Sequence, residues 1–326
     1  MSNKKSSNLK LILATSFILL FGVVGFYIYA KQQPTTSNDV ATSTTPTVVA
    51  RDPNTKYLEF LAMGDFGTGG AGQMQVAESL SKVAASEPAS FVLLLGDNFY
   101  EDGVESVEDP QWKTKFEDVY NKPGLNIPFY AVLGNHDYRK NPQAEVDYTK
   151  KSKKWRMPDK YYTFTETVDD KTQVQFFCLD STPLVEMRST NDLENIKKMV
   201  QWLEQQLQSS TSRWKIVAAH HPLYSNGPHG DSGVMINVFE PILEKYKVDF
   251  YICGHDHSLQ LLKPIKGVRH IVSGGGGKIT PVRYASNTEF AATNLGFARL
   301  RISNSDTTIT FYDKDGKTSY ATTVKK

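Results

Sequence analysis

The sequence is poor in cysteine and has no marked excess of charge of either sign. Its two cysteines, Cys178 and Cys253, each lie inside an apolar run, which is typical of small buried thiols. Two cysteines are too few for a disulfide scaffold or a thiolate metal cage. The 37 basic and 35 acidic residues leave a formal charge of +2, so charge gives no reason to expect a nucleic-acid partner.

A long apolar run without charges occupies residues 11–30. It is long enough to cross a hydrocarbon core of about 30 Å, and three lysines in residues 1–10 favour a cytoplasmic N-terminus. We therefore expect a transmembrane signal anchor that places the remaining chain outside the cytoplasm: periplasmic, luminal or at the cell surface. A cleaved signal peptide, which would make the protein secreted, is the alternative. Residues 31–56, rich in Thr, Ser and Pro, are typical of a flexible linker.

Residues 57–326 alternate between short apolar runs and helical periods, and we expect one folded domain there. The apolar runs are strand candidates, and a helical stripe is formed, for example, by Leu193, Ile196, Val200, Leu203 and Leu207. The early runs are apolar throughout, as in strands buried on both faces, whereas the late runs are more typical of an antiparallel meander. The pattern predicts an α/β fold with two sheets.

Short motifs rich in Gly, Asp, Asn and His follow the ends of several apolar runs. The endings are GDFG (64–67), GDNFY (96–100), GNHD (134–137), the pair His220-His221, and GHDH (254–257). Taken singly, such an Asp is usually a turn or cap residue, and a lone His is usually structural. However, the carboxyl ends of strands form the ligand crevice of α/β sheets, and six histidines lie in or beside these endings, leaving only His270 elsewhere. Carboxylates, an amide, imidazoles and a phenol without thiolates suit iron, manganese or zinc.

The ligands are too many for one ion, and two bridged metals would form a clamp for displacement at phosphorus. The five endings, together with VAAH (217–220), resemble the motifs of the purple acid phosphatases. The resemblance covers roughly residues 57 to 280 and is strongest to the small, tartrate-resistant type. It implies a single calcineurin-like metallophosphoesterase domain, with two sheets in α/β/β/α layers.

The resemblance also implies a metal-ligand set. Asp65, Asp97, Tyr100 and His257 would hold the first metal, and Asp97, Asn135, His220 and His255 the second. The phenolate of Tyr100 favours Fe(III) at the first position, while Fe, Zn and Mn remain open for the divalent second ion. Related metallophosphoesterases of other types have a His two residues after the first Asp, where this chain has Gly67. In an extended segment His255 and His257 would point to the same side, each toward one ion.

The function implied is hydrolysis of phosphate monoesters by an acid phosphatase, through attack of metal-bound hydroxide at a binuclear centre. His136 and His229 would be catalytic, protonating the leaving alkoxide and, with Asn135, binding a small phosphate ester. Three further residues would orient the metal ligands without binding the metals themselves: His221, Asp137 and Asp256. Two alternatives stay open: a phosphodiesterase or pyrophosphatase on the same site, and a metal-containing surface binding module without turnover.

Overall fold

The computed structural model describes residues 54–187 and 189–326. The expected cytoplasmic N-terminus, the expected transmembrane anchor and nearly all of the expected linker lie outside these residues. Among the described helices, none combines the length and the apolar character needed to cross a bilayer. The strands of the described part form two seven-stranded sheets, which confirms the predicted two-sheet α/β fold.

The first sheet has the order β14-β13-β12-β1-β2-β3-β4. Neighbouring strands from β1 to β4 are parallel. The last three strands form the predicted antiparallel meander, which pairs with β1 through β12. The strand bounds are β1 (Leu58–Met63), β2 (Phe91–Leu94), β3 (Phe129–Ala131), β4 (Trp155–Arg156), β12 (Gly296–Ile302), β13 (Asp306–Asp313) and β14 (Thr318–Lys325).

The second sheet has the order β11-β9-β10-β8-β7-β6-β5. Its centre is parallel, from β6 through β7 and β8 to β10, and antiparallel strands flank this centre on both sides. The strand bounds are β5 (Tyr162–Asp169), β6 (Thr172–Cys178), β7 (Trp214–Ala218), β8 (Phe250–Cys253), β9 (Leu259–Leu262), β10 (Arg269–Ser273) and β11 (Thr288–Ala292).

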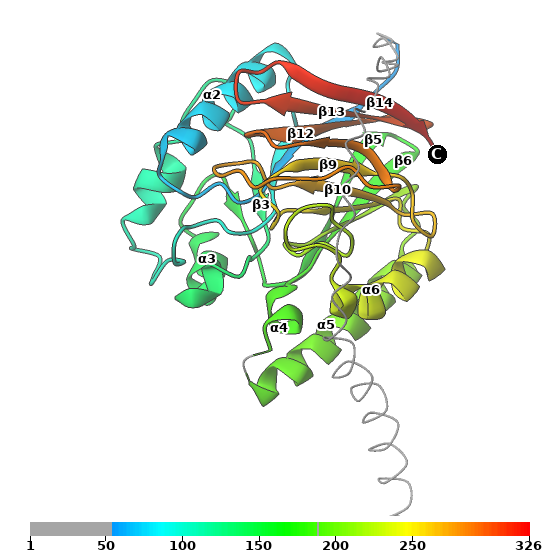
Figure 1. Cartoon of the computed structure of the whole chain (residues 1–326), viewed down its shortest axis with the longest axis horizontal. Helices are drawn as coiled ribbons and strands as arrows, with labels where there is room; N and C mark the ends of the chain where they lie inside the picture. The colour runs from blue at the N-terminus through cyan, green and yellow to red at the C-terminus, as the bar shows by residue number, and fades with distance from the viewer. Residues whose placement is uncertain (1–53, 188) are drawn as a thin grey trace, which may run out of the picture. The chain divides into compact units, whose positions relative to one another are not determined.

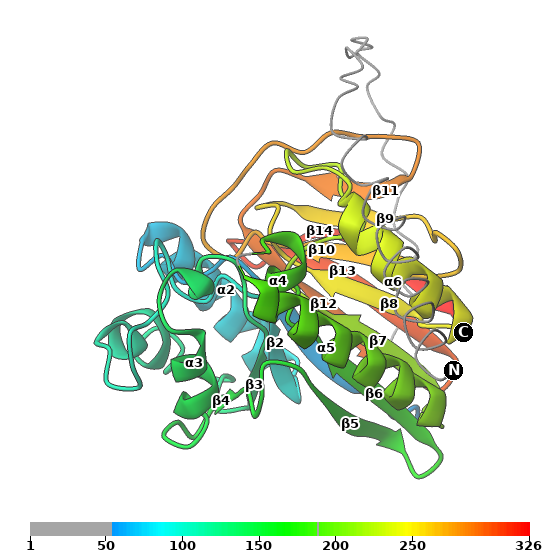
Figure 2. The same cartoon turned by 90° about the horizontal axis from the view of Figure 1, so that it is seen from below.

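The α-helices cover the outer faces of the two sheets. Helix α2 (Ala71–Ser86) contacts β12 and β13, and α5 (Thr190–Ser209) and α6 (Gly233–Lys245) lie side by side along the second sheet (Figures 1 and 2). The short helices are α3 (Pro142–Tyr148) and α4 (Thr182–Val185), with a π-helical turn at Trp112–Glu117 and a 3-10 turn at Asp137–Arg139.

Two apolar cores explain why the central strands are apolar on both faces. Phe60 and Phe91 of the first sheet contact Phe176 of the second, with ring centroids 5.2 and 5.3 Å apart, in the core between the sheets. The next residue of β6, Phe177, instead belongs to the core beneath α5 and α6, with Leu203. Because successive strand residues point to opposite faces, β6 is buried by a sheet on one side and by helices on the other. Both cysteines are free and buried, as predicted.

Candidate metal centre

The polar endings of five strands meet at one edge of the two-sheet stack. Asp65, Asp97 and Asn135 follow β1, β2 and β3 of the first sheet, whereas His220 and His255 follow β7 and β8 of the second. The N–H of His255 donates to Asp65 Oδ2 over 2.9 Å, and the Nδ1 atom of His220 lies 2.9 Å from the carbonyl oxygen of Leu95 at the end of β2. The predicted convergence of the strand ends is therefore present across both sheets.

Three of the converging residues have left-handed backbone conformations. The φ angles are 59° at Asp65, 52° at Asp97 and 69° at His255, a region that is costly for residues other than glycine. The extended geometry that we expected for the GHDH segment is therefore wrong, because the chain turns at His255. The neighbouring Gly254 is needed for close approach, since an added Cβ there would lie 2.4 Å from Asp65 Oδ2.

Two carboxylates and an imidazole surround the Tyr100 hydroxyl. This group donates toward Asp97 Oδ2 at 2.9 Å and Asp65 Oδ1 at 3.1 Å, and it lies 3.1 Å from His257 Nε2. Burial and the nearby Asp97 raise the pKa of Asp65, and burial together with both carboxylates raises the pKa of Tyr100. Two buried carboxylates and a phenol so close together form a hard, anionic donor set, which fits a metal ion.

The second cluster contains imidazoles and an amide. Because the Nδ1–H of His220 donates to a carbonyl oxygen, its Nε2 atom carries a lone pair. That atom lies 3.0 Å from Asn135 Oδ1, 3.1 Å from His255 Nδ1 and 3.5 Å from Asp97 Oδ1. The Nε2 lone pair therefore faces the oxygens of Asn135 and Asp97, and a bound cation would remove the repulsion between them. The donor set thus fits a metal ion, with Asp97 adjoining both clusters.

Within the described part of the chain, two groups of potential ligand atoms are compact enough for an ion. One contains Asp65, Asp97 and His220, and the other contains His220, His221 and His255, with the ligand atoms of each group within 4.8 Å of one another. At Gly67 an added Cβ would lie 1.7 Å from the carbonyl oxygen of Asn98. This backbone therefore excludes the His that related metallophosphoesterases of other types have at that position.

The two histidines predicted to act on the substrate lie at the edge of the clusters. The N–H of His136 donates to Asp97 Oδ1 over 2.9 Å, and its Nδ1–H donates to the carbonyl oxygen of Glu101 over 2.5 Å. The ring of His229 lies 4.0 Å from that of His255, and its Nδ1–H donates to Asp256 Oδ1 over 2.8 Å. This hydrogen bond raises the pKa of His229, although partial burial opposes the shift.

The three residues predicted to support the ligands are all buried. Asp137 accepts hydrogen bonds from the backbone N–H groups of Gly134, Asn98 and Phe99, and it therefore ties the β2 and β3 endings together. Burial and the charge of Asp97 raise the pKa of Asp137 to about 8. Asp256 faces His229 and the Ser225 hydroxyl, and the Nδ1 atom of His221 lies 2.9 Å from Ser181 Oγ.

Lys278 is a residue of the site that the sequence alone did not single out. Its ammonium group lies 3.9 Å from the centre of the Tyr100 ring and 2.7 Å from Glu101 Oε1. The only signal was its place directly after the glycine run 274–277. Gly276 and Gly277 in that run pack against Gly64 and Phe66, where added Cβ atoms would lie 2.4 and 2.7 Å from backbone oxygens. This contact brings Lys278 to Tyr100.

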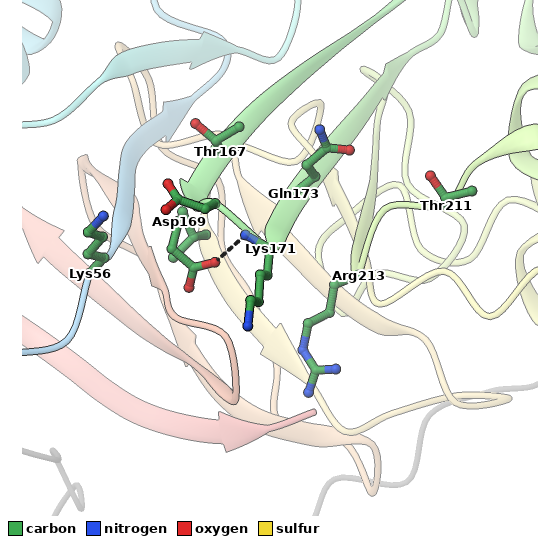
Figure 3. Close-up of a pocket in the computed structure, with 9 residues that line it drawn as sticks. Lys56, Thr167, Asp169, Lys171, Gln173, Thr211 and Arg213 are labelled. Carbon is green, nitrogen blue, oxygen red and sulfur yellow. Dashed lines mark hydrogen bonds between the residues drawn. The ribbon is translucent and has the colours of Figure 1, made fainter.

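A separate pocket of about 440 Å³ contains none of these residues (Figure 3). Its lining comes from the residues around the β5–β6 turn and from Lys56, Thr211 and Arg213. Lys171 donates its backbone N–H to Asp169 across that turn over 2.8 Å. The strand-end motifs and this pocket are therefore distinct features of the fold.

Comparisons with known proteins agree with the geometry of the centre. Residues 58–259 match the calcineurin-like phosphoesterase family. The chain is 32% identical to tartrate-resistant acid phosphatase type 5 of Oryctolagus cuniculus, over 83% of this chain and 92% of that protein. It is also 32% identical to purple acid phosphatase 7 of Arabidopsis thaliana, over 82% of this chain and 86% of that protein.

A solved structure is also similar over most of the chain. It is described as GAP50, the anchor in the inner membrane complex of Plasmodium, and it aligns with a TM-score of 0.76 at 26% identity over 83% of this chain and 89% of that one. The side chains at the strand ends, the two-sheet fold and these relatives lead to one assignment. The chain belongs to the calcineurin-like phosphoesterase family and, within it, to the purple acid phosphatases of the tartrate-resistant type.

Proposed function

We propose that this protein is an acid phosphatase that hydrolyses small phosphate monoesters at a binuclear metal centre. The observation that carries the proposal is the Tyr100 hydroxyl, which lies within 3.1 Å of Asp65, Asp97 and His257. A phenol placed between two buried carboxylates and an imidazole would suit a hard metal ion. The family relationship supports the activity.

The proposed metal ligands form two overlapping sets. Fe(III) would be held by Asp65, Asp97, Tyr100 and His257, because a hard, anionic donor set favours a trivalent ion. A divalent ion, Fe, Zn or Mn, would be held by Asp97, Asn135, His220 and His255. When bound, the two ions supply an activated water as nucleophile and neutralise the charge of the phosphoryl group.

Side chains of the protein would bind the phosphate group and supply the proton. The Nδ1–H of His136 is engaged by the carbonyl oxygen of Glu101, and the Nη2 atom of Arg139 lies 3.3 Å from the Nε2 atom of His136. We assign this pair, with Asn135, to binding phosphate oxygens. His229 has its Nδ1–H engaged by Asp256 and is half-exposed, so its Nε2 atom can reach a bound ester. We assign to the imidazolium form of His229, which carries a proton on Nε2 as well, the role of protonating the leaving alkoxide.

For the N-terminal part we keep the domain scheme inferred from the sequence. Residues 1–10 would be cytoplasmic, 11–30 a transmembrane signal anchor, 31–56 a linker and 57–326 the catalytic domain, which would lie outside the cytoplasm. Lys4, Lys5 and Lys10 before the apolar run support this orientation. N-terminal sequencing of the mature protein and its partition between membrane and soluble fractions test the scheme, and a mature chain beginning after residue 30 would contradict it.

The activity is tested by release of inorganic phosphate from p-nitrophenyl phosphate, with Asp97→Ala as the inactive control and with metal analysis of the same samples. We expect two metals per wild-type chain, one of them iron, and an acid pH optimum. A diester measured in parallel distinguishes a phosphodiesterase, which would turn over the diester faster. Metal-loaded wild type that releases no phosphate from any ester would overturn the proposal.

A second candidate is a surface binding module that keeps the metal ligands without turnover. It is favoured by the likeness to GAP50, which is described as an anchor in a membrane complex, together with the apolar run near the N-terminus. A metal-loaded protein that is inactive on every ester, yet folded and membrane-bound, would favour this candidate.

A further inference from the structure

His221 has a buried ring nitrogen without a hydrogen-bond partner. The residue is 2% exposed, and its Nδ1 atom lies 2.9 Å from Ser181 Oγ. Among the described residues no donor or acceptor reaches the Nε2 atom. Buried polar atoms of side chains nearly always have a hydrogen-bond partner. An unpartnered nitrogen beside a candidate metal site therefore points to an ion that this nitrogen would bind.

Hydrogen bonds hold both the backbone and the imidazole of His221. Ser181 Oγ accepts the backbone N–H of His221 over 3.1 Å and also lies next to Nδ1. The Tyr251 hydroxyl donates to the carbonyl oxygen of His221 over 2.7 Å. A metal-ligating His typically has its other ring nitrogen engaged in this way, which sets the tautomer and the ring orientation.

The free nitrogen lies among the ligands of the second cluster. The His221 ring centroid is 4.5 Å from that of His255 and 4.9 Å from that of His220. The ligand atoms of these three residues lie within 4.8 Å of one another. Since Nδ1 is engaged by Ser181, Nε2 is the atom that His221 can offer to an ion.

We propose that His221 is a third imidazole ligand of the divalent ion held by His220 and His255, and that this site selects zinc. The proposal rests on the binuclear centre of the proposed function, and it replaces the supporting role that the sequence suggested for His221. Three imidazoles form a borderline-soft nitrogen set, which suits Zn²⁺ better than the hard, oxygen-preferring Mn²⁺.

The experiment uses the full-length protein with iron and zinc bound. Zinc-edge X-ray absorption counts the imidazoles around zinc, and competition with a chromophoric chelator measures the Kd for Zn²⁺. We expect three imidazoles in wild type and two in His221→Phe. The Kd should rise about 100-fold, because even the loss of an outer hydrogen-bond partner of a ligand costs roughly 10- to 100-fold.

Two further variants separate ligation from folding. Ser181→Ala removes the partner of Nδ1 and should weaken Zn²⁺ binding about 10-fold. His270→Phe is the matched control, because His270 is also 2% exposed with an unpartnered ring nitrogen but lies outside the ligand groups; its Kd should equal that of wild type. Since Phe removes an unsatisfied buried nitrogen, the metal-free His221→Phe protein should unfold at no lower temperature than metal-free wild type.

The outcomes distinguish this proposal from the broader one. Wild type that binds two metals, with only two imidazoles at zinc and an unchanged Kd in His221→Phe, would overturn the role of His221 and leave the phosphatase proposal intact. Wild type that binds no metal pair would overturn both. Equal binding of manganese and zinc would refute the selectivity.

Discussion

Replacing Asp256 with asparagine removes the charge that faces His229 and keeps an oxygen that can accept its Nδ1–H. Asp256 is fully buried, whereas the His229 side chain is 49% exposed, and the two atoms lie 2.8 Å apart. A hydrogen bond to a charged partner is more stabilising than one to a neutral partner. Because His229 is half-exposed, solvent screens the charge, and we take the loss as about 1 kcal/mol. This energy corresponds to about a fivefold effect in rate.

The effect should depend on the leaving group. Alkyl phosphates need a proton on the departing oxygen, so kcat/KM for an alkyl ester should fall about fivefold in Asp256→Asn. For 2,4-dinitrophenyl phosphate, whose leaving group needs no proton, kcat/KM should change less than about twofold. Phosphate release measured on both esters gives the two numbers.

The control variant is Asp231→Asn, in the loop that carries His229. Asp231 accepts the backbone N–H of Ser225 over 3.0 Å and is not a partner of His229. Asp231→Asn should change kcat/KM for the two esters by the same factor. An equal loss on both esters in Asp256→Asn would show that Asp256 acts only on folding or metal binding, and the role of His229 as proton donor would lose its support.

Three other predictions concern pH, metal and backbone. Burial raises the pKa of Asp180 to about 7, so the folded chain keeps a proton that the unfolded chain loses near pH 4. Asp180 alone should therefore lower the free energy of unfolding of the metal-free protein by up to about 4 kcal/mol between pH 4 and 7. Denaturant titrations should show a flatter pH dependence in Asp180→Asn, and an identical slope would contradict the assignment. Iron-loaded wild type should show a broad tyrosinate band in the visible spectrum that Tyr100→Phe lacks, and a band that persists in the variant would exclude Tyr100 as an iron ligand. Gly67→Ala places a Cβ 1.7 Å from a backbone oxygen and should lower the free energy of unfolding by about 3 kcal/mol, whereas an unchanged denaturation midpoint would show that this loop can move.

The sequence by itself determined the kind of fold and the kind of site. Runs such as FVLL and FYIC are apolar at every position, which is typical of strands covered on both faces. Glycine followed by a polar residue where such a run ends marks a position at the carboxyl edge of a sheet. These signals are local, because they depend on the side-chain period of a strand and on turn chemistry, and they were sufficient to place Asp65, Asp97 and Asn135 together.

Only the tertiary structure decided which side chains face one another across the two sheets. Two contacts join segments that no local sequence pattern relates: Asp256 with His229, and Lys278 with the Tyr100 ring. The unpartnered ring nitrogen of His221 also became visible only in the structure. The left-handed turn at His255 also differed from the extended segment that the sequence suggested. The physical reason is that distances between such segments follow from how the two sheets stack, and side-chain packing over the whole core sets that stacking.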